Sequence, residues 1–163
     1  MRVGIGHDTH RLVPGRPLWI GGVEIESDLG AVGHSDADVL LHAITDALLG
    51  SASLGDIGQW FPDTDPEFQD ADSSQFVLAA RDALRERGLG IVNLDLIVFA
   101  ERPRLSPLSV KIRERLAELL EIPIGQVNLK AKTGEGVGPV GRREAIQAMA
   151  VVLVDDVTTD EAS

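Results

Sequence analysis

The sequence contains no cysteine. A chain without thiols has neither a disulfide framework nor thiolate ligands for a metal, and it suits the reducing cytoplasm, where we expect it to be located. No apolar run approaches the length of a membrane span, and the first residues lack the apolar segment of a signal peptide. Internal repeats and low-complexity segments are also absent. We therefore expect an ordinary globular protein.

Basic residues are scarce: 15 Lys and Arg stand against 26 Asp and Glu, which gives a net charge of -11 at pH 7. Nucleic acids and anionic membranes bind proteins that carry a positive field, so neither is expected as a partner. A phosphate-bearing substrate would require metal ions and a few local basic side chains. The 163 residues, 44% of them hydrophobic, suffice for one core, and we expect a single domain over 1–155 and an acidic, disordered tail over 156–163.

Hydrophobic periodicity predicts a mixture of strands and helices. The strand-like segments are 2–11, 18–20, 23–25, 91–100, 126–132 and 144–154, and the helical ones are the second half of 34–50, 73–87 and 108–120. Gly21-Gly22 predicts a hairpin turn, and the segments 26–36, 51–72, 103–107 and 133–142 are predicted to be loops. Since the glycine fingerprint of dinucleotide-binding folds is absent, the predicted class is α+β, a mixed β-sheet with helices on one face.

The segment 34–50 carries the first candidate site. Apolar residues in its second half recur at helical spacing, and Asp36 or Ser35 is the expected N-cap. On the same helix Asp38, His42 and Asp46 follow one another at i, i+4 and i+8, so they share one stripe. A single helical histidine is more often a solvated or hydrogen-bonded residue than a metal ligand. A metal site therefore depends on partners elsewhere in the chain.

The first strand supplies such partners. Asp8 and His10 are two residues apart, so on a strand they point to the same face. With His42 they would form an open set of two histidines and one carboxylate, which suits zinc but also manganese, cobalt or ferrous iron. We expect Asp38 or Asp46 to accept the second ring N–H of His42.

The glycine-rich loop 133–142 is a second candidate site. It follows Lys132 and contains Thr133, Glu135 and Arg142, but it lacks the lysine spacing of a phosphate-binding P-loop and by itself is more typical of a turn. A glutamate among phosphate-contacting groups is a natural ligand for Mg²⁺. Together with the histidine site, this loop offers the groups that phosphoryl transfer requires.

Aspartates in the irregular segment 51–72 have two possible roles. Asp56, Asp63 and Asp65 are suited to binding the hydroxyl groups of a sugar or polyol. Alternatively, their side chains cap turns of the backbone. A long segment without periodicity in a small domain is typically functional or mobile.

In combination, these segments resemble the 2-C-methyl-D-erythritol 2,4-cyclodiphosphate synthase family over residues 2–154. The matching motifs are Gly6-His-Asp-Thr-His10, Gly21-Gly22, His34-Ser-Asp-Ala-Asp38, His42-Ala-Ile-Thr-Asp-Ala-Leu-Leu-Gly50, Leu54-Gly-Asp-Ile-Gly58, Phe61-Pro-Asp-Thr-Asp65, Pro103 to Pro107, Lys130-Ala-Lys-Thr133 with Glu135, and Gly141-Arg142.

The resemblance implies a phosphorus–oxygen lyase of non-mevalonate isoprenoid biosynthesis. The substrate would be 4-diphosphocytidyl-2-C-methyl-D-erythritol 2-phosphate. Its 2-phosphate would attack its own β-phosphate, close 2-C-methyl-D-erythritol 2,4-cyclodiphosphate and release CMP. Such an intramolecular reaction needs positioning and charge neutralisation rather than a covalent nucleophile.

The resemblance also assigns residues to roles. Asp8, His10 and His42 match the ligands of one divalent transition metal, expected to be zinc, with manganese or cobalt as alternatives. Glu135 matches the ligand of a second ion, Mg²⁺ or Mn²⁺, and His34 and Thr133 match the catalytic positions that stabilise the transition state. The positions that match substrate-binding residues are Asp8, His10, His34, Ser35, Asp56, Ile57, Gly58, Phe61, Pro62, Asp63, Thr64, Asp65, Ala100, Pro103, Arg104, Leu105, Ser106, Lys132, Thr133, Gly134, Glu135, Pro139 and Arg142.

The implied assembly is a homotrimer around a threefold axis, with active sites between subunits. The chain departs from the family pattern at three positions: Arg104 replaces a usual Lys, Pro139 replaces a large side chain beside an apolar cavity on the axis, and Arg143 replaces a frequent Gly. From its length we expect no cytidylyltransferase domain of the kind that some members carry.

Two other functions are compatible with the same ligands. A metal-dependent phosphohydrolase would use a metal-bound water to attack a phosphate ester. A non-catalytic trimeric binding or metal-storage protein would need the metal ligands but not His34, Thr133 or Glu135.

Overall fold

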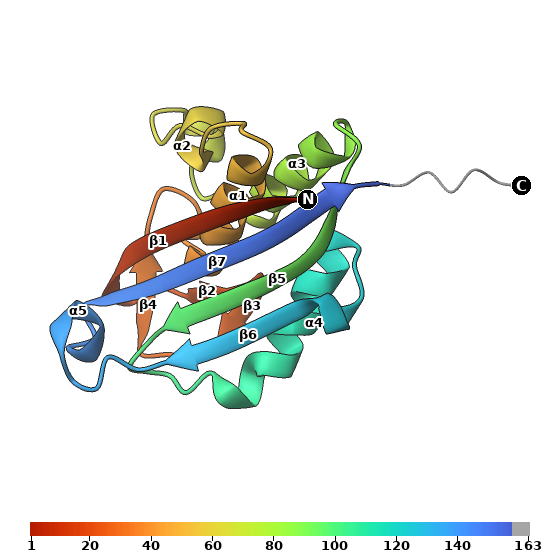
Figure 1. Cartoon of the computed structure of the whole chain (residues 1–163). Coiled ribbons are helices and arrows are strands. Elements are labelled where there is room, and N and C mark those ends of the chain that lie inside the picture. The colour runs from red at the N-terminus through yellow and green to blue at the C-terminus, as the bar shows by residue number, and fades with distance from the viewer. Residues whose placement is uncertain (158–163) are drawn as a thin grey trace, which may run out of the picture.

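Alternating buried and exposed residues form the strands of the main sheet. The computed structural model describes residues 1–157, and its five-stranded sheet has the order β4 (Leu29–Val32), β1 (Arg2–Pro14), β7 (Ala145–Asp156), β5 (Leu89–Phe99) and β6 (Val127–Lys132) (Figure 1). β5 and β6 are parallel, whereas the other neighbouring strands are antiparallel. The predicted mixed sheet is therefore confirmed.

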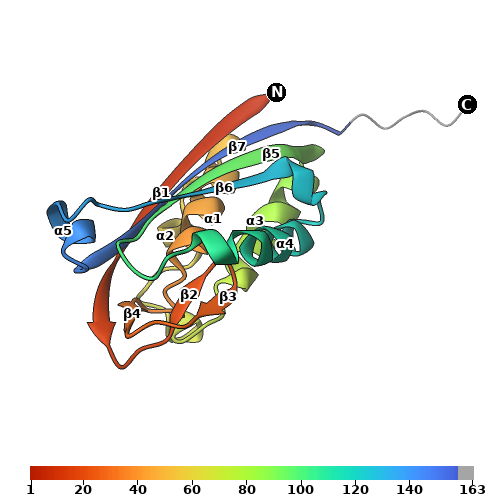
Figure 2. The same ribbon diagram turned by 90° about the horizontal axis from the view of Figure 1, so that it is seen from below.

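The principal helices pack on one face of this sheet. Figure 2 shows the sheet nearly edge-on, with α1 (Val39–Ser51), α3 (Ser74–Arg85) and α4 (Ser109–Leu120) on the same side. The hairpin β2 (Leu18–Ile20) and β3 (Val23–Ile25) lies beyond α1, away from the sheet. Shorter helical elements are α2 (Ile57–Trp60), α5 (Gly138–Gly141), η1 (Pro66–Phe68), η2 (Ser106–Leu108) and η3 (Ile124–Gln126). Within residues 1–157, no helix combines the length and hydrophobicity needed to cross a membrane.

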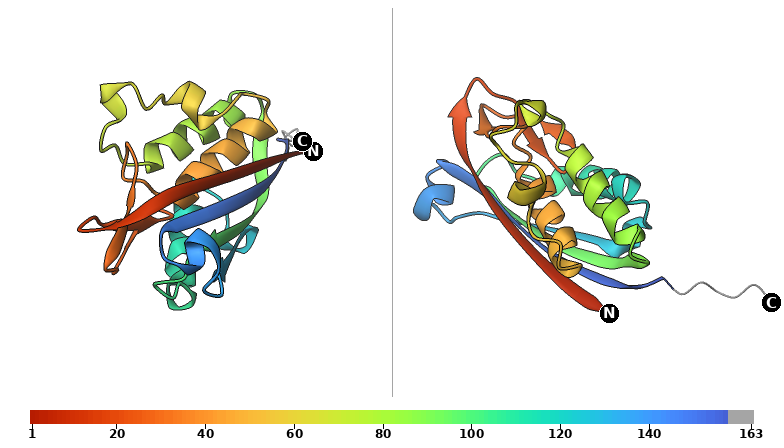
Figure 3. Two further views of the ribbon diagram at one scale, coloured as in Figure 1. Left: turned by 90° about the vertical axis from the view of Figure 1, so that its left-hand side faces the viewer. Right: turned by 90° about the horizontal axis from the view of Figure 1, so that it is seen from above.

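Helix α1 lies at the centre of the core, because two glycines of β1 let the strand touch the helix backbone. A Cβ atom on Gly4 would lie 1.8 Å from the Ala47 carbonyl oxygen, and one on Gly6 would lie 1.9 Å from the Ala43 carbonyl oxygen. Both views in Figure 3 show α1 lying across β1 and β7. This close contact fixes the distance between the strand and the helix that carry the predicted metal ligands.

Asp38 is the N-cap of α1, and the prediction of Asp36 or Ser35 was wrong. The Asp38 side chain is fully buried and accepts hydrogen bonds from the backbone N–H groups of Leu40 and Leu41. It also accepts from Gly21 and Gly22, in the turn that joins β2 to β3. Burial raises the pKa of this carboxyl group, and the hydrogen bonds from the backbone of Gly22, Leu41 and Gly21 oppose that shift. Asp38 thus joins the predicted glycine hairpin to the central helix.

Several short elements fall inside segments that were predicted to be loops. β4 forms within 26–36 because β1 continues to Pro14 and offers an edge for pairing over Arg11–Pro14. α2 and α5 form within 51–72 and 133–142. β7 extends to Asp156, so residue 156 belongs to a strand and not to the predicted tail. Residues 158–163 lie outside the described residues.

Candidate metal centre and active site

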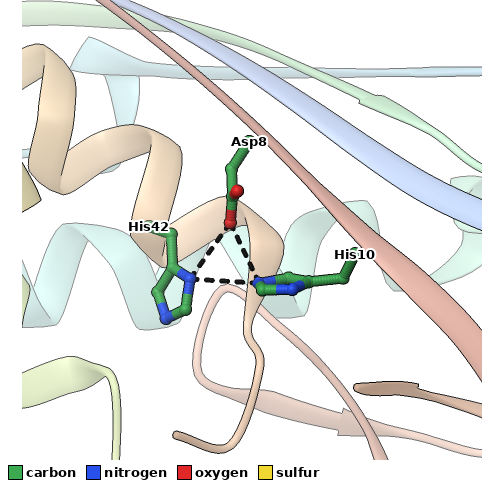
Figure 4. Close-up of side chains that lie close together, drawn as sticks. All are labelled: Asp8, His10 and His42. Atoms are coloured by element: carbon green, nitrogen blue, oxygen red, sulfur yellow. Dashed lines mark hydrogen bonds and ion pairs between the residues drawn. The ribbon is translucent and has the colours of Figure 1, made fainter. Parts of the chain in front are cut away.

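Three predicted ligands meet between β1 and α1. The Asp8 Oδ2 atom lies 3.0 Å from His42 Nδ1 and 3.0 Å from His10 Nε2, and the two nitrogens are 3.1 Å apart (Figure 4). Asp8 and His10 project from the same face of β1, as their spacing predicts, and His42 comes from the second turn of α1. The predicted convergence of these side chains is confirmed.

The donor set fits a tetrahedral metal ion. Ligand atoms about 2.0–2.1 Å from such an ion are separated by about 3.3 Å, close to the spacing of these three atoms. Within residues 1–157, Asp8, His10 and His42 form the one group of His, Asp or Glu side chains whose ligand atoms could share a metal. Two imidazoles and one carboxylate leave a fourth position open for another ligand, and they do not distinguish zinc from manganese, cobalt or ferrous iron.

Electrostatics favour an ionised carboxylate at the centre of the group. Burial alone would raise the pKa of Asp8, but hydrogen bonds with His10 and His42 hold it well below its usual range. Burial alone would lower the pKa of His42, but the hydrogen bond with Asp8 and the negative charges of Asp8, Asp38 and Asp36 raise it. Asp8 is therefore negatively charged and stabilises positive charge on its neighbours. The same negative charge would attract a divalent cation.

The outer ring nitrogen of His42 faces hydroxyl groups rather than a carboxylate. His42 Nε2 lies 2.9 Å from Ser73 Oγ and 3.0 Å from Ser35 Oγ. The prediction that Asp38 or Asp46 would accept this N–H was wrong, because both carboxylates have other partners. Asp38 is occupied by backbone donors, and Asp46 accepts from the backbone N–H of Ile57.

A cavity of about 640 Å³ opens beside the three ligands. Its walls include many of the predicted residues, namely Asp8, His10, His34, Ser35, His42, Ile57, Gly58, Phe61, Pro62, Asp63 and Thr64. Asp56 and Asp65 do not line it, since their side chains cap α2 and η1. The capping alternative is thus confirmed for these two aspartates. The Asp65 backbone still contributes, because its carbonyl oxygen lies 3.1 Å from His34 Nε2.

The other predicted residues form a second group at the ends of β5 and β6. Lys132 ends β6, and its carbonyl oxygen accepts from the backbone N–H of Ala100. In the following loop Thr133 donates a hydrogen bond to Glu135, with Oγ1 and Oε1 2.8 Å apart. None of the residues in 100–106 or 132–142 lines the cavity beside the three ligands. Within one chain, the predicted site is therefore divided into two parts.

Comparison with known proteins identifies the family. The model of the YgbB family matches residues 1–155. The chain belongs to this family. The 2-C-methyl-D-erythritol 2,4-cyclodiphosphate synthase of Synechococcus elongatus is 53% identical over 94% of this chain and 96% of its own length.

Solved structures agree with this assignment. A 2C-methyl-D-erythritol-2,4-cyclodiphosphate synthase with 43% identity superposes with a TM-score of 0.88, over 94% of this chain and 100% of that one. A second structure of the same name, in a form bound to CDP, is 42% identical, has a TM-score of 0.88 and has the same coverage. The predicted resemblance to the synthase family is confirmed.

The departures from the synthase pattern lie in the second group. Arg143 has a φ of 60°, a left-handed conformation that explains the frequent glycine at this position. Its guanidinium group pairs with Asp28. Arg102, Arg104 and Arg143 help to line a cavity of about 740 Å³ together with the acidic residues Glu26 and Asp28. Pro139 lies in the first turn of α5, and Arg142 is paired with Glu144 at 3.0 Å.

Sequence reasoning missed two aromatic residues of the cavity, Phe68 and Phe76, and one residue that contacts His42 from outside it, Ser73. Phe68 and Phe76 pack against Phe61, and the ring centroids of Phe76 and His42 are 6.0 Å apart. Phe76 occupies a helical position that reads as ordinary core. Ser73 reads as a helix cap. For Phe76 and Ser73, the sequence pattern therefore predicted a structural role rather than a role in the site.

Proposed function

We propose that this chain catalyses the cyclisation of 4-diphosphocytidyl-2-C-methyl-D-erythritol 2-phosphate to 2-C-methyl-D-erythritol 2,4-cyclodiphosphate, with release of CMP. An oxygen of the 2-phosphate bonds to the β-phosphorus, and the bond between that phosphorus and the oxygen of the CMP phosphate breaks. The observation that carries the proposal is the convergence of Asp8, His10 and His42 beside a cavity, in a chain that belongs to the synthase family. Residues 1–155 would act as one synthase domain, located in the cytoplasm.

The proposed roles rest on the resemblance to the synthase family and, for Asp8, His10 and His42, on their convergence. Asp8, His10 and His42 would hold a divalent transition metal, and Glu135 would hold Mg²⁺ or Mn²⁺. When bound, these ions would polarise the diphosphate and neutralise its charge. His34 and Thr133 would donate hydrogen bonds to phosphate oxygens in the transition state, and the aromatic wall at Phe61 would exclude water from the phosphorus.

The remaining proposed contacts divide between the two groups. The methylerythritol phosphate would lie in the cavity lined by Ser35, Ile57, Gly58 and 61–64, next to the capping residues Asp56 and Asp65. Cytidine and the diphosphate would contact 100–106 and 132–135, with Pro139 and Arg142 nearby. Ala100 and Leu105 have side chains in the core, so cytidine would meet their backbone groups.

A homotrimer would bring the two groups together across subunits. The face of the sheet opposite the helices carries apolar side chains, and Val3 and Ile5 are 65% and 64% exposed there. Val151 is paired with Ile5 in the sheet register and extends this apolar surface. Exposed apolar side chains on one face of a protein often mark a subunit interface. We therefore propose that this face packs on two further copies of the chain.

Replacing Ile5 with lysine should dissociate the trimer, since each interface would then bury a charge. Sedimentation velocity should give three times the chain mass for the unchanged protein and for Val110→Lys, which adds a lysine at an exposed position of α4. Ile5→Lys should sediment as a smaller species and should lose CMP formation. A trimeric, fully active Ile5→Lys protein would contradict this assembly.

Removal of divalent ions should abolish CMP formation. After treatment with a chelator, the protein should release no CMP above background, and addition of Zn²⁺ with Mg²⁺ should restore release. Ion-exchange chromatography of the products separates the alternatives, because a phosphohydrolase would release inorganic phosphate. A protein that binds metal without converting the substrate would instead be a binding protein.

A further inference from the structure

Ser73 stands at the N-cap of α3, but its side chain does not cap the helix. Serine is favoured at this position because its hydroxyl accepts hydrogen bonds from the first turn. Here the hydroxyl faces away from the helix, and the side chain is fully buried beside His42. Because the buried Ser73 hydroxyl does not cap the helix, other groups must hold it in place.

Asp36 is the group that holds it. The Asp36 carboxylate accepts from the Ser73 hydroxyl through Oδ1 and from the Ser73 backbone N–H through Oδ2, the latter at 3.0 Å. Asp36 itself is fixed by the loop, because its backbone N–H donates to the Ala71 carbonyl oxygen at 3.0 Å. The Asp36 carboxylate therefore binds Ser73 through two hydrogen bonds.

This contact determines the direction of every hydrogen bond around the serine. An ionised carboxylate only accepts, so the one hydroxyl proton of Ser73 points to Asp36. The two lone pairs of Ser73 Oγ then accept from His42 Nε2 at 2.9 Å and from Ser35 Oγ at 3.1 Å. His42 consequently carries a proton on Nε2, which leaves Nδ1, the nitrogen beside Asp8 and His10, as the atom that would bind a metal.

We infer that Ser73, anchored by Asp36, is a positioning residue that fixes the tautomer and the ring orientation of His42 for metal binding. This inference rests on the metal site of the proposed function. Ser73 touches neither the metal position nor the cavity, and it acts through His42. A chain of hydrogen bonds, here called the relay, runs from the Asp36 carboxylate through the Ser73 hydroxyl to the His42 imidazole. It takes the place of a direct contact between a carboxylate and the histidine.

Calorimetric titration of the metal-free, full-length protein with Zn²⁺ tests the relay. Ser73→Ala should weaken binding by roughly 10- to 100-fold, the usual effect of removing a partner that orients a ligand. Ser74→Ala is the matched control, because Ser74 is also buried and adjacent but is not among the hydrogen-bond partners of the His42 ring. Asp36→Asn keeps the size of the anchor and should weaken binding less than Ser73→Ala. Should Ser73→Ala fail to fold, Asp36→Asn supplies the same test.

Long-range ¹H–¹⁵N correlation spectra of the zinc-loaded protein provide a readout that a general loss of stability would not change. In the unchanged protein the His42 ring should carry its proton on Nε2. A proton on Nδ1, or zinc affinity that stays unchanged in both Ser73→Ala and Asp36→Asn, would overturn the inference. If the unchanged protein bound no Zn²⁺ at all, the metal site of the proposed function would itself be wrong.

Discussion

His42→Ala is expected to eliminate both metal binding at the β1–α1 site and formation of the cyclic product. The substitution removes one of three ligands, and the two that remain come from a single strand. Zn²⁺ affinity should fall by more than the roughly 100-fold expected for loss of a supporting contact. Calorimetry and CMP release measure the two effects.

His34→Ala is the informative comparison. His34 lines the same cavity but is not part of the metal-binding group, so this variant should bind Zn²⁺ normally and still lose CMP formation. Retention of activity by His42→Ala would contradict the role of the metal centre. Loss of metal by His34→Ala would show that the loop before α1, rather than the ligands alone, determines binding.

Gly6→Ala is expected to be the most damaging single-methyl substitution near the site. The new Cβ would lie 1.9 Å from the Ala43 carbonyl oxygen, a backbone atom that cannot rotate away. β1 must then separate from α1, which should cost about 3 kcal/mol of unfolding free energy. Because Asp8 and His10 lie on β1 and His42 lies on α1, Zn²⁺ affinity should also fall, by about tenfold or more.

Two further variants separate these effects. Gly125→Ala adds the same methyl group where no atom lies within 4 Å, and it should change unfolding free energy by less than about 0.5 kcal/mol. Gly4→Ala meets Ala47 at 1.8 Å and should destabilise the fold as strongly, with a smaller effect on the more distant ligands. Denaturant unfolding of the metal-free proteins measures the stabilities. Wild-type stability in Gly6→Ala would mean that β1 and α1 are not in direct backbone contact.

The candidate metal ligands were predictable because the spacing that selects them is local. The two-residue spacing of Asp8 and His10 on a strand places both on one face, and helical spacing selects His42. The surroundings were not predictable in the same way. Asp38 was expected near His42, but its partners Gly21 and Gly22 lie 16 or 17 positions earlier in the chain, on a turn that only the folded structure brings close. The position beside His42 that was expected for Asp38 is taken by Ser73, which lies 31 positions after His42.

The strands and helices were predicted well where periodicity was long. The main errors concern elements of a few residues. β4 exists because a continued β1 offers it an edge, and this pairing depends on tertiary contacts rather than on local propensity. α5 contains three of the loop's turn-forming residues, Gly138, Pro139 and Gly141, so composition alone indicated a loop.

Phosphorus NMR of the products tests the central proposal most directly. The purified protein is incubated with 4-diphosphocytidyl-2-C-methyl-D-erythritol 2-phosphate, Mg²⁺ and Zn²⁺, beside His42→Ala. Two mutually coupled resonances of a cyclic diphosphate should appear with an equal amount of CMP, and neither should appear with the variant. Inorganic phosphate in place of the cyclic product, or an unchanged substrate spectrum, would contradict the assignment of this chain as a cyclodiphosphate-forming enzyme.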